Sequence, residues 1–168
     1  MAYLTRDQLN EIPFKHLGQN VKISEKASIH SPEQISIGDN TRIDDFCVLS
    51  GKISFGRNVH IAVFCNIAGG SEGITFGDFS GLAYGCHVFS QSDDYTGATL
   101  TNPTVPAEYK KEIKKKVSIG KHCLIGTNSS IFPGVDVAEG CSVGAMSMLI
   151  KSTKPWGIYF GIPAKRMK

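Results

Sequence analysis

Two adjacent carboxylates, Asp93 and Asp94, stand where the stretch "GCHVFSQSDDYTG" breaks a regular pattern of apolar residues. A carboxylate accepts a proton from an attacking hydroxyl when desolvation raises its pKa, and two neighbouring carboxylates raise one another's pKa values. If the acceptor is an amine, which is a nucleophile once neutral, the carboxylates need only orient it. The plainer alternative is loop chemistry, because Ser and Asp start turns readily.

His87 is a second candidate base, six residues before Asp93. It occupies the last position of its six-residue unit, which we expect to point outward at a corner of the fold. An imidazole beside a cleft takes up a proton near neutral pH, although a surface or interface histidine is an equally simple interpretation. The other histidines are expected at the surface, and the distant spacing of His60, His87 and His122 argues against a zinc site.

The elements that must position these residues repeat every six residues. The large apolar positions of the C-terminal part are Ile119, Ile125, Ile131, Val137, Val143 and Leu149. A small or modest residue follows four positions after each. A period of six fits neither a helix nor a half-buried strand, but it fits a triangular solenoid coil with three short strands per turn. Phe55 lies 18 residues after Ile37 and 21 before Phe76, which predicts a bulge near 69–73.

The cysteines follow the same pattern, since all of them fall at the small inward position. They are Cys47, Cys65, Cys86, Cys123 and Cys141. We expect buried thiols that pack as small hydrophobes, because paired CxxC zinc ligands are missing and an odd number does not suggest a disulfide framework.

The expected organisation is a single domain over residues 1–168. A cap over 1–16 contains a short helix, because Thr5 and Gln8 form a capping-box pattern. Coils follow over 17–154, interrupted by a loop over 94–118 that is too polar and Pro-rich to be a coil, and a second cap covers 155–168. A long insertion of this kind is more often functional than decorative.

Composition excludes several classes of protein. A net charge of +3 is too small to argue for nucleic-acid binding, and there is no apolar run long enough to span a membrane. The N-terminus "MAYLTRDQLNEI" lacks the basic start and apolar stretch of a signal peptide. These features predict a cytoplasmic protein.

The segment "IGTNSSIFPGVDVAEGCSVGAMSMLIKS", followed by "GIPAK", resembles the hexapeptide-repeat acyltransferases. The likeness is to the sugar O- and N-acetyltransferase branch, which includes galactoside and maltose acetyltransferases. It implies an all-β fold, a left-handed parallel β-helix of triangular coils, in homotrimers with active sites between subunits and acetyl-CoA as the donor. In these relatives the loop begins with a catalytic histidine. Counting without gaps from Gly77 and Asp78 places that residue at Asp93, so this chain departs from the pattern.

The resemblance also implies binding residues. For the donor they are Thr127 at the thioester through its backbone N–H, Ala145 at the pantetheine, Lys151 at the nucleotide end, and Lys165 with Arg166 at the phosphates. Trp156 offers a surface on which adenine could stack, and Asn66 and Tyr84 are acceptor candidates.

The expected activity is acetyl-CoA-dependent transfer to a hydroxyl or amine of a sugar or nucleotide-linked sugar by direct attack, without an acyl-enzyme or a metal. The alternative is a non-catalytic β-helix scaffold or a metal protein similar to the γ-carbonic anhydrases.

Overall fold

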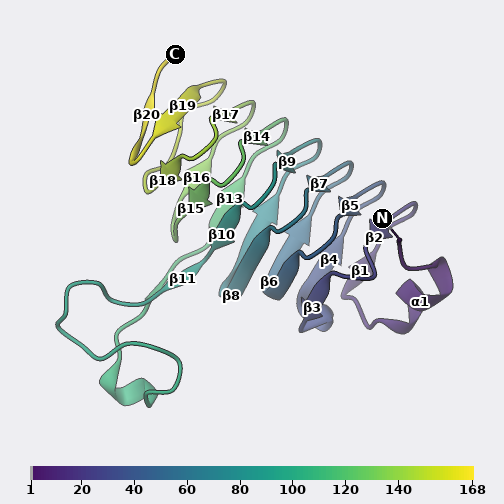
Figure 1. Ribbon diagram of the computed structural model, residues 1–168, viewed down its shortest axis with the longest axis horizontal. Coiled ribbons are helices and arrows are strands. Elements are labelled where there is room, and N and C mark those ends of the chain that lie inside the picture. Colours follow the sequence, from purple (N-terminus) through teal and green to yellow (C-terminus); the bar gives the residue numbers. More distant parts are fainter. Residues whose placement is uncertain (1) are drawn as a thin grey trace.

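A computed structural model describes residues 2–168, which form a left-handed parallel β-helix with one short helix and one projecting arm (Figure 1). Successive coils stack along the chain, so the N-terminus lies near one end of the β-helix and the C-terminus at the other. Each coil has three short strands, and residues 18 or more positions apart pair side by side on neighbouring coils, as Asn66 and His87 do. The predicted fold class is confirmed.

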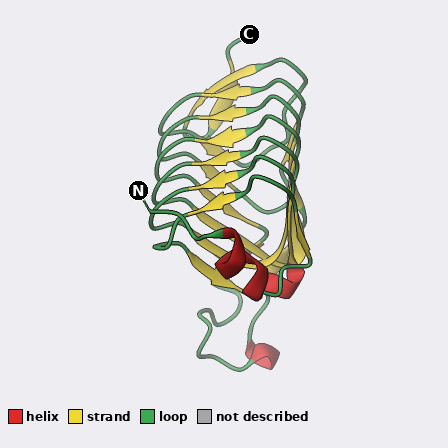
Figure 2. Ribbon diagram, turned by 90° about the vertical axis from the view of Figure 1, so that its right-hand side faces the viewer, coloured by secondary structure: helices red, strands yellow, loops and turns green. Residues whose placement is uncertain are grey.

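Three faces make up the triangular cross-section, and Figure 2 shows their strands stacked one above another. The first face comprises β2 (Lys22–Ile23), β5 (Arg42–Ile43), β7 (His60–Ile61), β9 (Gly81–Leu82), β14 (Leu124–Ile125), β17 (Ser142–Val143) and β19 (Ile158–Gly161). The second face comprises β3 (Ser28–His30), the first halves of β6 (Val48–Phe55) and β8 (Asn66–Phe76), β10 (His87–Phe89), β15 (Ser130–Ile131) and β18 (Met148–Leu149). The third face comprises β1 (His16–Leu17), β4 (Ile35–Ile37), the second halves of β6 and β8, β13 (Val117–Ile119) and β16 (Asp136–Val137).

The six-residue repeat arises because each strand turns one large and one small side chain into the coil. Isoleucines such as Ile43, Ile61 and Ile67 are completely buried, and small inward residues such as Cys47 and Cys65 are buried between them. A side chain is excluded just after the inward residue at several corners, since a Cβ on Gly38 would lie 2.4 Å from the carbonyl oxygen of Gly56. The repeat is therefore a consequence of filling a narrow triangular core.

The caps and the bulge agree with the sequence in most respects. Helix α1 (Arg6–Glu11) begins at Thr5, whose side chain and that of Gln8 complete the predicted capping box. A short 3-10 helix, η1 (Pro32–Gln34), occupies the turn before β4. The register between β6 and β8 shifts where Gly51 faces Gly70, which confirms the predicted bulge.

The arm leaves the β-helix after the buried Ser90 and returns at Lys115, whose N–H donates to the Ser90 carbonyl oxygen at 2.9 Å. Strands β11 (Gln91–Ser92) and β12 (Ile113–Lys114) pair antiparallel at its base, and η2 (Ala107–Tyr109) lies in its outer part. The predicted loop over 94–118 is thus too long at its C-terminal end, because β13 already belongs to the third face from Val117.

The C-terminal cap also differs from its prediction over 155–168. Strand β19 continues the first face, with Tyr159 beside Val143 and nearly buried, and β20 (Ala164–Arg166) folds back antiparallel on β19. The last coil is therefore closed by a hairpin that is continuous with the sheet.

The five cysteines should react slowly with a thiol reagent in the native protein and rapidly after denaturation. All are buried, which confirms their predicted position, and burial raises the pKa of Cys123 to about 11. The thiolate is the reactive form, so burial limits the access of a reagent to all five thiols, and at Cys123 it also disfavours ionisation. Time-resolved labelling with and without denaturant measures this, and fast native labelling of several thiols would contradict the assigned core.

Candidate active site

The corner between the first and second faces, here called the first corner, carries three of the predicted site residues in one column. Tyr84, Thr127 and Ala145 occupy the same turn position on successive coils. Their backbones are joined in series, because the N–H of Asn128 donates to Tyr84 O and that of Met146 donates to Thr127 O, each at 2.8 Å. Tyr84 is 59% exposed, so this column faces solvent.

The Thr127 amide is free to bind a ligand. No acceptor for its N–H exists within residues 2–168, because this turn position rotates the amide out of the ladder that joins the coils. An unpaired amide can donate to a thioester oxygen and stabilise the oxyanion that develops there. The geometry therefore allows the role that the resemblance implies for Thr127.

The β19–β20 hairpin closes the C-terminal end of the first corner. Gly161 follows Ala145 at this position and donates its N–H to the Ser147 hydroxyl at 3.1 Å. Lys165 pairs with Phe160 and Arg166 with Tyr159 across the hairpin, and both cations are exposed. Two positive charges thus stand at the end of the column, as binding of a phosphate group requires.

Two predicted donor residues lie elsewhere on the same subunit. Lys151 is at the corner between the second and third faces, just after β18. Trp156 is at the corner between the third and first faces, where its amide donates to Glu139 O. Its indole lies 6.5 Å from the His122 ring. One subunit therefore does not bring these two residues together with Thr127 and Ala145.

His87 and Asn66 are direct register partners on the second face, and both point outward. His87 lies in the middle of a face and not at a corner, which corrects the expected placement, because the turn precedes it at Tyr84 and Gly85. The pair nevertheless stands beside the first corner, and Ser130 continues the same row on the next coil. A molecule at the first corner would therefore have a histidine and an amide on its flank.

The two aspartates have different environments on the arm. Asp93 is half-buried and lines a shallow pocket with Phe89 and Tyr95. The Asp94 carboxylate accepts hydrogen bonds at 2.9 Å from both the N–H and the hydroxyl of Thr96. These bonds hold the pKa of Asp94 below its ordinary value. The expectation that the pair would raise one another's pKa values is therefore wrong for Asp94.

Sequence reasoning missed a charged cluster on the first face. Asp44 is 2% exposed and accepts from Arg42 Nη2 at 3.0 Å, while His60 Nε2 lies 2.8 Å from its Oδ2. The Tyr3 hydroxyl also donates to Asp44 at 3.3 Å. Burial alone raises the pKa of the Asp44 carboxyl, but the bonds to His60 and Arg42 outweigh it and hold the pKa below its ordinary value. The cluster borders a groove lined by His60, Gly81, Tyr84 and Leu124.

Residues 2–168 contain no group of three or more His, Cys, Asp or Glu side chains that could hold a metal ion. His60 lies on the first face, His87 on the second face, and His122 at the corner between the third and first faces. Within residues 2–168, no helix has the length and apolar character that crossing a membrane requires.

Comparisons with known proteins agree with this architecture. Residues 116–145 match the family model described as the hexapeptide repeat of succinyl-transferase. The chain is 42% identical over 168 residues to the dTDP-4-amino-4,6-dideoxy-D-glucose acyltransferase of Escherichia coli, covering 98% of this chain and 87% of that one.

Solved structures give the same result. AntD, an N-acyltransferase from Bacillus cereus, solved with dTDP and 3-hydroxybutyryl-CoA, is 44% identical with a TM-score of 0.98, over 99% of this chain and 88% of that one. A second AntD structure, of a variant with dTDP-4-amino-4,6-dideoxyglucose and coenzyme A, is 45% identical with a TM-score of 0.98, over 99% and 90%. The chain belongs to the hexapeptide-repeat acyltransferase family, and it is an acyltransferase that uses an acyl-CoA donor.

Proposed function

We propose that this protein transfers an acyl group from coenzyme A to the amino group of a dTDP-linked 4-amino-4,6-dideoxy sugar. The observation that carries the proposal is the similarity, over nearly the whole chain, to an enzyme named for that acceptor and to an N-acyltransferase solved with it. The carboxylates at the start of the arm fit this choice, because a neutral amine needs no strong base to attack a thioester.

The reaction is a direct displacement at the thioester carbon. The neutral amine attacks the carbonyl, a C–N bond forms, and negative charge develops on the oxygen beside the Thr127 N–H. The C–S bond then breaks, and the amine proton is transferred to the departing thiolate, directly or through a side chain or water. The products are an amide and free coenzyme A, and no acyl-enzyme is needed.

The arm carboxylates are assigned to the amine. Asp94 stays ionised at neutral pH because Thr96 stabilises the charged form, so it attracts the ammonium form of the acceptor and orients the amine after its proton leaves. Asp93, which lines a pocket beside the root of the arm, is placed to share this role. In support, AntD was also crystallised with one of its aspartates replaced by alanine or asparagine.

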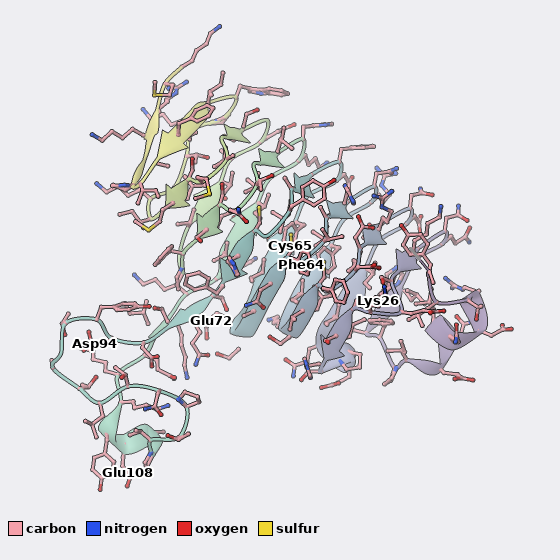
Figure 3. All side chains as sticks on the ribbon, in the orientation of Figure 1. Lys26, Phe64, Cys65, Glu72, Asp94 and Glu108 are labelled. Carbon is pink, nitrogen blue, oxygen red and sulfur yellow. The ribbon has the colours of Figure 1, made fainter. Side chains whose placement is uncertain are left out.

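A homotrimer would bring the separated parts of the site together. Figure 3 shows Asp94 on the arm, well away from the β-helix coil that carries Phe64. Large apolar side chains are exposed along the first corner, including Phe46, Tyr84 and Met146. We assign this corner to a subunit interface in which one subunit's arm reaches the first corner of its neighbour. A cytoplasmic location is proposed with it, because nucleotide sugars and acyl-CoA are soluble metabolites.

A thiol-release assay tests the proposed acceptor class. With acetyl-CoA as donor, the dTDP-linked amino sugar should release coenzyme A much faster than the same amino sugar without its nucleotide. The dTDP group does not react, but the energy of its binding to the enzyme stabilises the transition state. Equal rates for the two acceptors would contradict recognition of a nucleotide sugar.

Replacing Lys165 and Arg166 together by alanine should raise the KM for acyl-CoA and leave the acceptor KM nearly unchanged. Each lost contact to a phosphate costs roughly 1–2 kcal/mol, which is on the order of tenfold. Steady-state kinetics with each substrate varied in turn measures this, and Lys154→Ala, another exposed cation on the last coil, is the control. A rise confined to the acceptor KM would place the hairpin on the acceptor side.

A further inference from the structure

The bulge between the second and third faces borders a pocket that the proposed function does not use. Where the register shifts, one residue of β6, Lys52, faces three residues of β8, 71–73. Glu72 lies on this bulge, near the strands that begin the arm (Figure 3). The extra residues help to enclose a cavity of about 160 Å³ on the third face.

A missing side chain on the third face helps to form this pocket. Gln34, Lys52, Gly73 and Lys116 occupy the same position on successive coils, just before the first inward residue of the third face. Because Gly73 has no side chain, the stem of Lys52 lies over its backbone. The Lys52 Cγ and Cδ atoms are 3.2 Å from the point where a Cβ on Gly73 would stand. The glycine therefore allows lysines from different coils to line one cavity.

The lining of the pocket is positively charged. Lys15, Lys52 and Lys116 contribute three ammonium groups and Glu72 contributes one carboxylate, so the formal net charge is 3 − 1 = +2. Within residues 2–168, none of the three ammonium groups has a carboxylate oxygen within 4.0 Å. The positive charge of the pocket is therefore left for a ligand to neutralise.

Hydroxyl groups line the same pocket in a row across the coils. Ser36, Ser54 and Thr75 are register partners on β4, β6 and β8. The next residue in this row, Ser118, donates its hydroxyl to Asp136. The hydroxyls of the other three make no hydrogen bond to another group of residues 2–168. Three hydroxyls and three ammonium groups can thus all donate to a bound anion.

The size of the cavity and its charge indicate what kind of anion fits. Pockets for whole small molecules enclose about 300–1,000 Å³, so a cavity of about 160 Å³ holds one anionic group rather than a nucleotide. A phosphate dianion balances the net charge of +2, and lysine commonly binds phosphate as a point charge.

We propose that this pocket binds a phosphate group, either as inorganic phosphate or at the end of a larger molecule that otherwise stays in solvent. The site is separate from the donor site, because the third face lies opposite the first corner of the triangle. The inference goes beyond the proposed function and does not rest on it, since phosphate binding needs no turnover.

Titration with sodium phosphate at pH 7 and constant ionic strength, followed by phosphorus NMR, tests the proposal. Lys52→Met and Lys116→Met should each weaken binding by about tenfold, because each removes a charged donor. Glu72→Gln should strengthen binding, because it removes the carboxylate that repels the anion. Lys121→Met is the matched control, since Lys121 is an exposed lysine outside the pocket, and it should bind phosphate as the wild type does.

Glucose 1-phosphate separates the two sources of the phosphate group. Binding as tight as that of inorganic phosphate would assign the pocket to a phosphate ester, whereas binding of inorganic phosphate alone would assign it to the free ion. Either result supports the site. Unchanged affinity in both Lys52→Met and Lys116→Met would overturn it.

Two further measurements test whether the pocket is separate from the active site. Phosphate should still bind when Lys165 and Arg166 are both replaced by alanine, and loss of binding there would place the anion at the β19–β20 hairpin and overturn the inference. Lys52→Met should keep the wild-type KM for acyl-CoA and for the acceptor. A rise in the acceptor KM would make the pocket part of the active site and would also overturn the inference. Phosphate binding by an inactive wild type would refute only the proposed function.

Discussion

Replacing Asp44 by alanine is expected to lower the free energy of unfolding by about 2 kcal/mol. Removing one partner of a buried ion pair costs about 3–5 kcal/mol, and exposed pairs contribute about 1 kcal/mol or less. Asp44 itself is buried, but its partners Arg42 and His60 are nearly half exposed, so an intermediate value applies. Without the carboxylate, Arg42 and His60 face one another across 3.0 Å with no acid between them.

The same cluster makes stability depend on pH in a defined direction. Because the folded-state pKa of Asp44 lies below its unfolded value of about 3.9, its contribution is fully present above that pH. It is lost as the pH falls through the folded-state pKa.

Denaturant unfolding at pH 7 and at pH 3 measures both effects. The wild type should lose more stability between the two pH values than Asp44→Ala does. Asp78→Ala is the control, since Asp78 pairs with Arg57 at 3.1 Å, but its side chain is 19% exposed, against 3% for that of Asp44. Its effect at pH 7 should be much smaller. Equal destabilisation by the two variants would contradict a special role for the Asp44 cluster.

Asp94→Asn should raise the KM for the amino-sugar acceptor by roughly ten- to a hundredfold, because an ionised hydrogen-bond partner of the ammonium form is lost. The substituted amide keeps an oxygen that can accept the Thr96 N–H, so the turn on the arm is preserved. Raising the pH should restore much of the rate as more of the amine becomes neutral. Kinetics over a range of pH, with acceptor and donor varied separately, gives the measurement.

Two further variants, measured in parallel, show which side chain acts on the acceptor. Asp93→Asn tests the carboxylate in the pocket at the root of the arm, and His87→Asn tests the imidazole on the second face. If His87→Asn abolishes turnover while both aspartate variants remain near wild type, the histidine is the base and the assignment of the carboxylates is wrong. A fall in kcat of about 10²–10⁴-fold for an aspartate variant, without recovery at high pH, would indicate a general base and a hydroxyl acceptor.

The repeat predicted the coils well because every inward position obeys the same steric limit. The repeat failed to predict the bounds of the coils where the chain enters or leaves the regular pattern. The regular series of large apolar residues resumes at Ile119, which predicts loop at Val117, yet Val117 is buried and fills the small inward position of that coil. Tyr159 falls in the predicted cap, where the hexad pattern ends, yet it continues the first face beside Val143.

The site was harder to predict because its contacts join coils. Arg42 and His60 are 18 residues apart, so the superperiod places them side by side, but each looked like an isolated surface residue. The pKa of Asp94 depends on its hydrogen bonds to Thr96, and its position depends on the path of the arm. Neither follows from a repeat. Likewise, the resemblance groups Lys151 and Trp156 with Thr127, but these residues lie at three different corners of the triangle.

The most direct test compares two acceptors that differ only in the reacting group: dTDP-4-amino-4,6-dideoxyglucose and dTDP-6-deoxyglucose, which bears a hydroxyl at that carbon. With acyl-CoA as donor, mass spectrometry should find an acylated product from the amino sugar alone, and that product should resist mild hydroxylamine as an amide does. Comparable acylation of the hydroxyl analogue, giving an ester that hydroxylamine cleaves, would contradict the account.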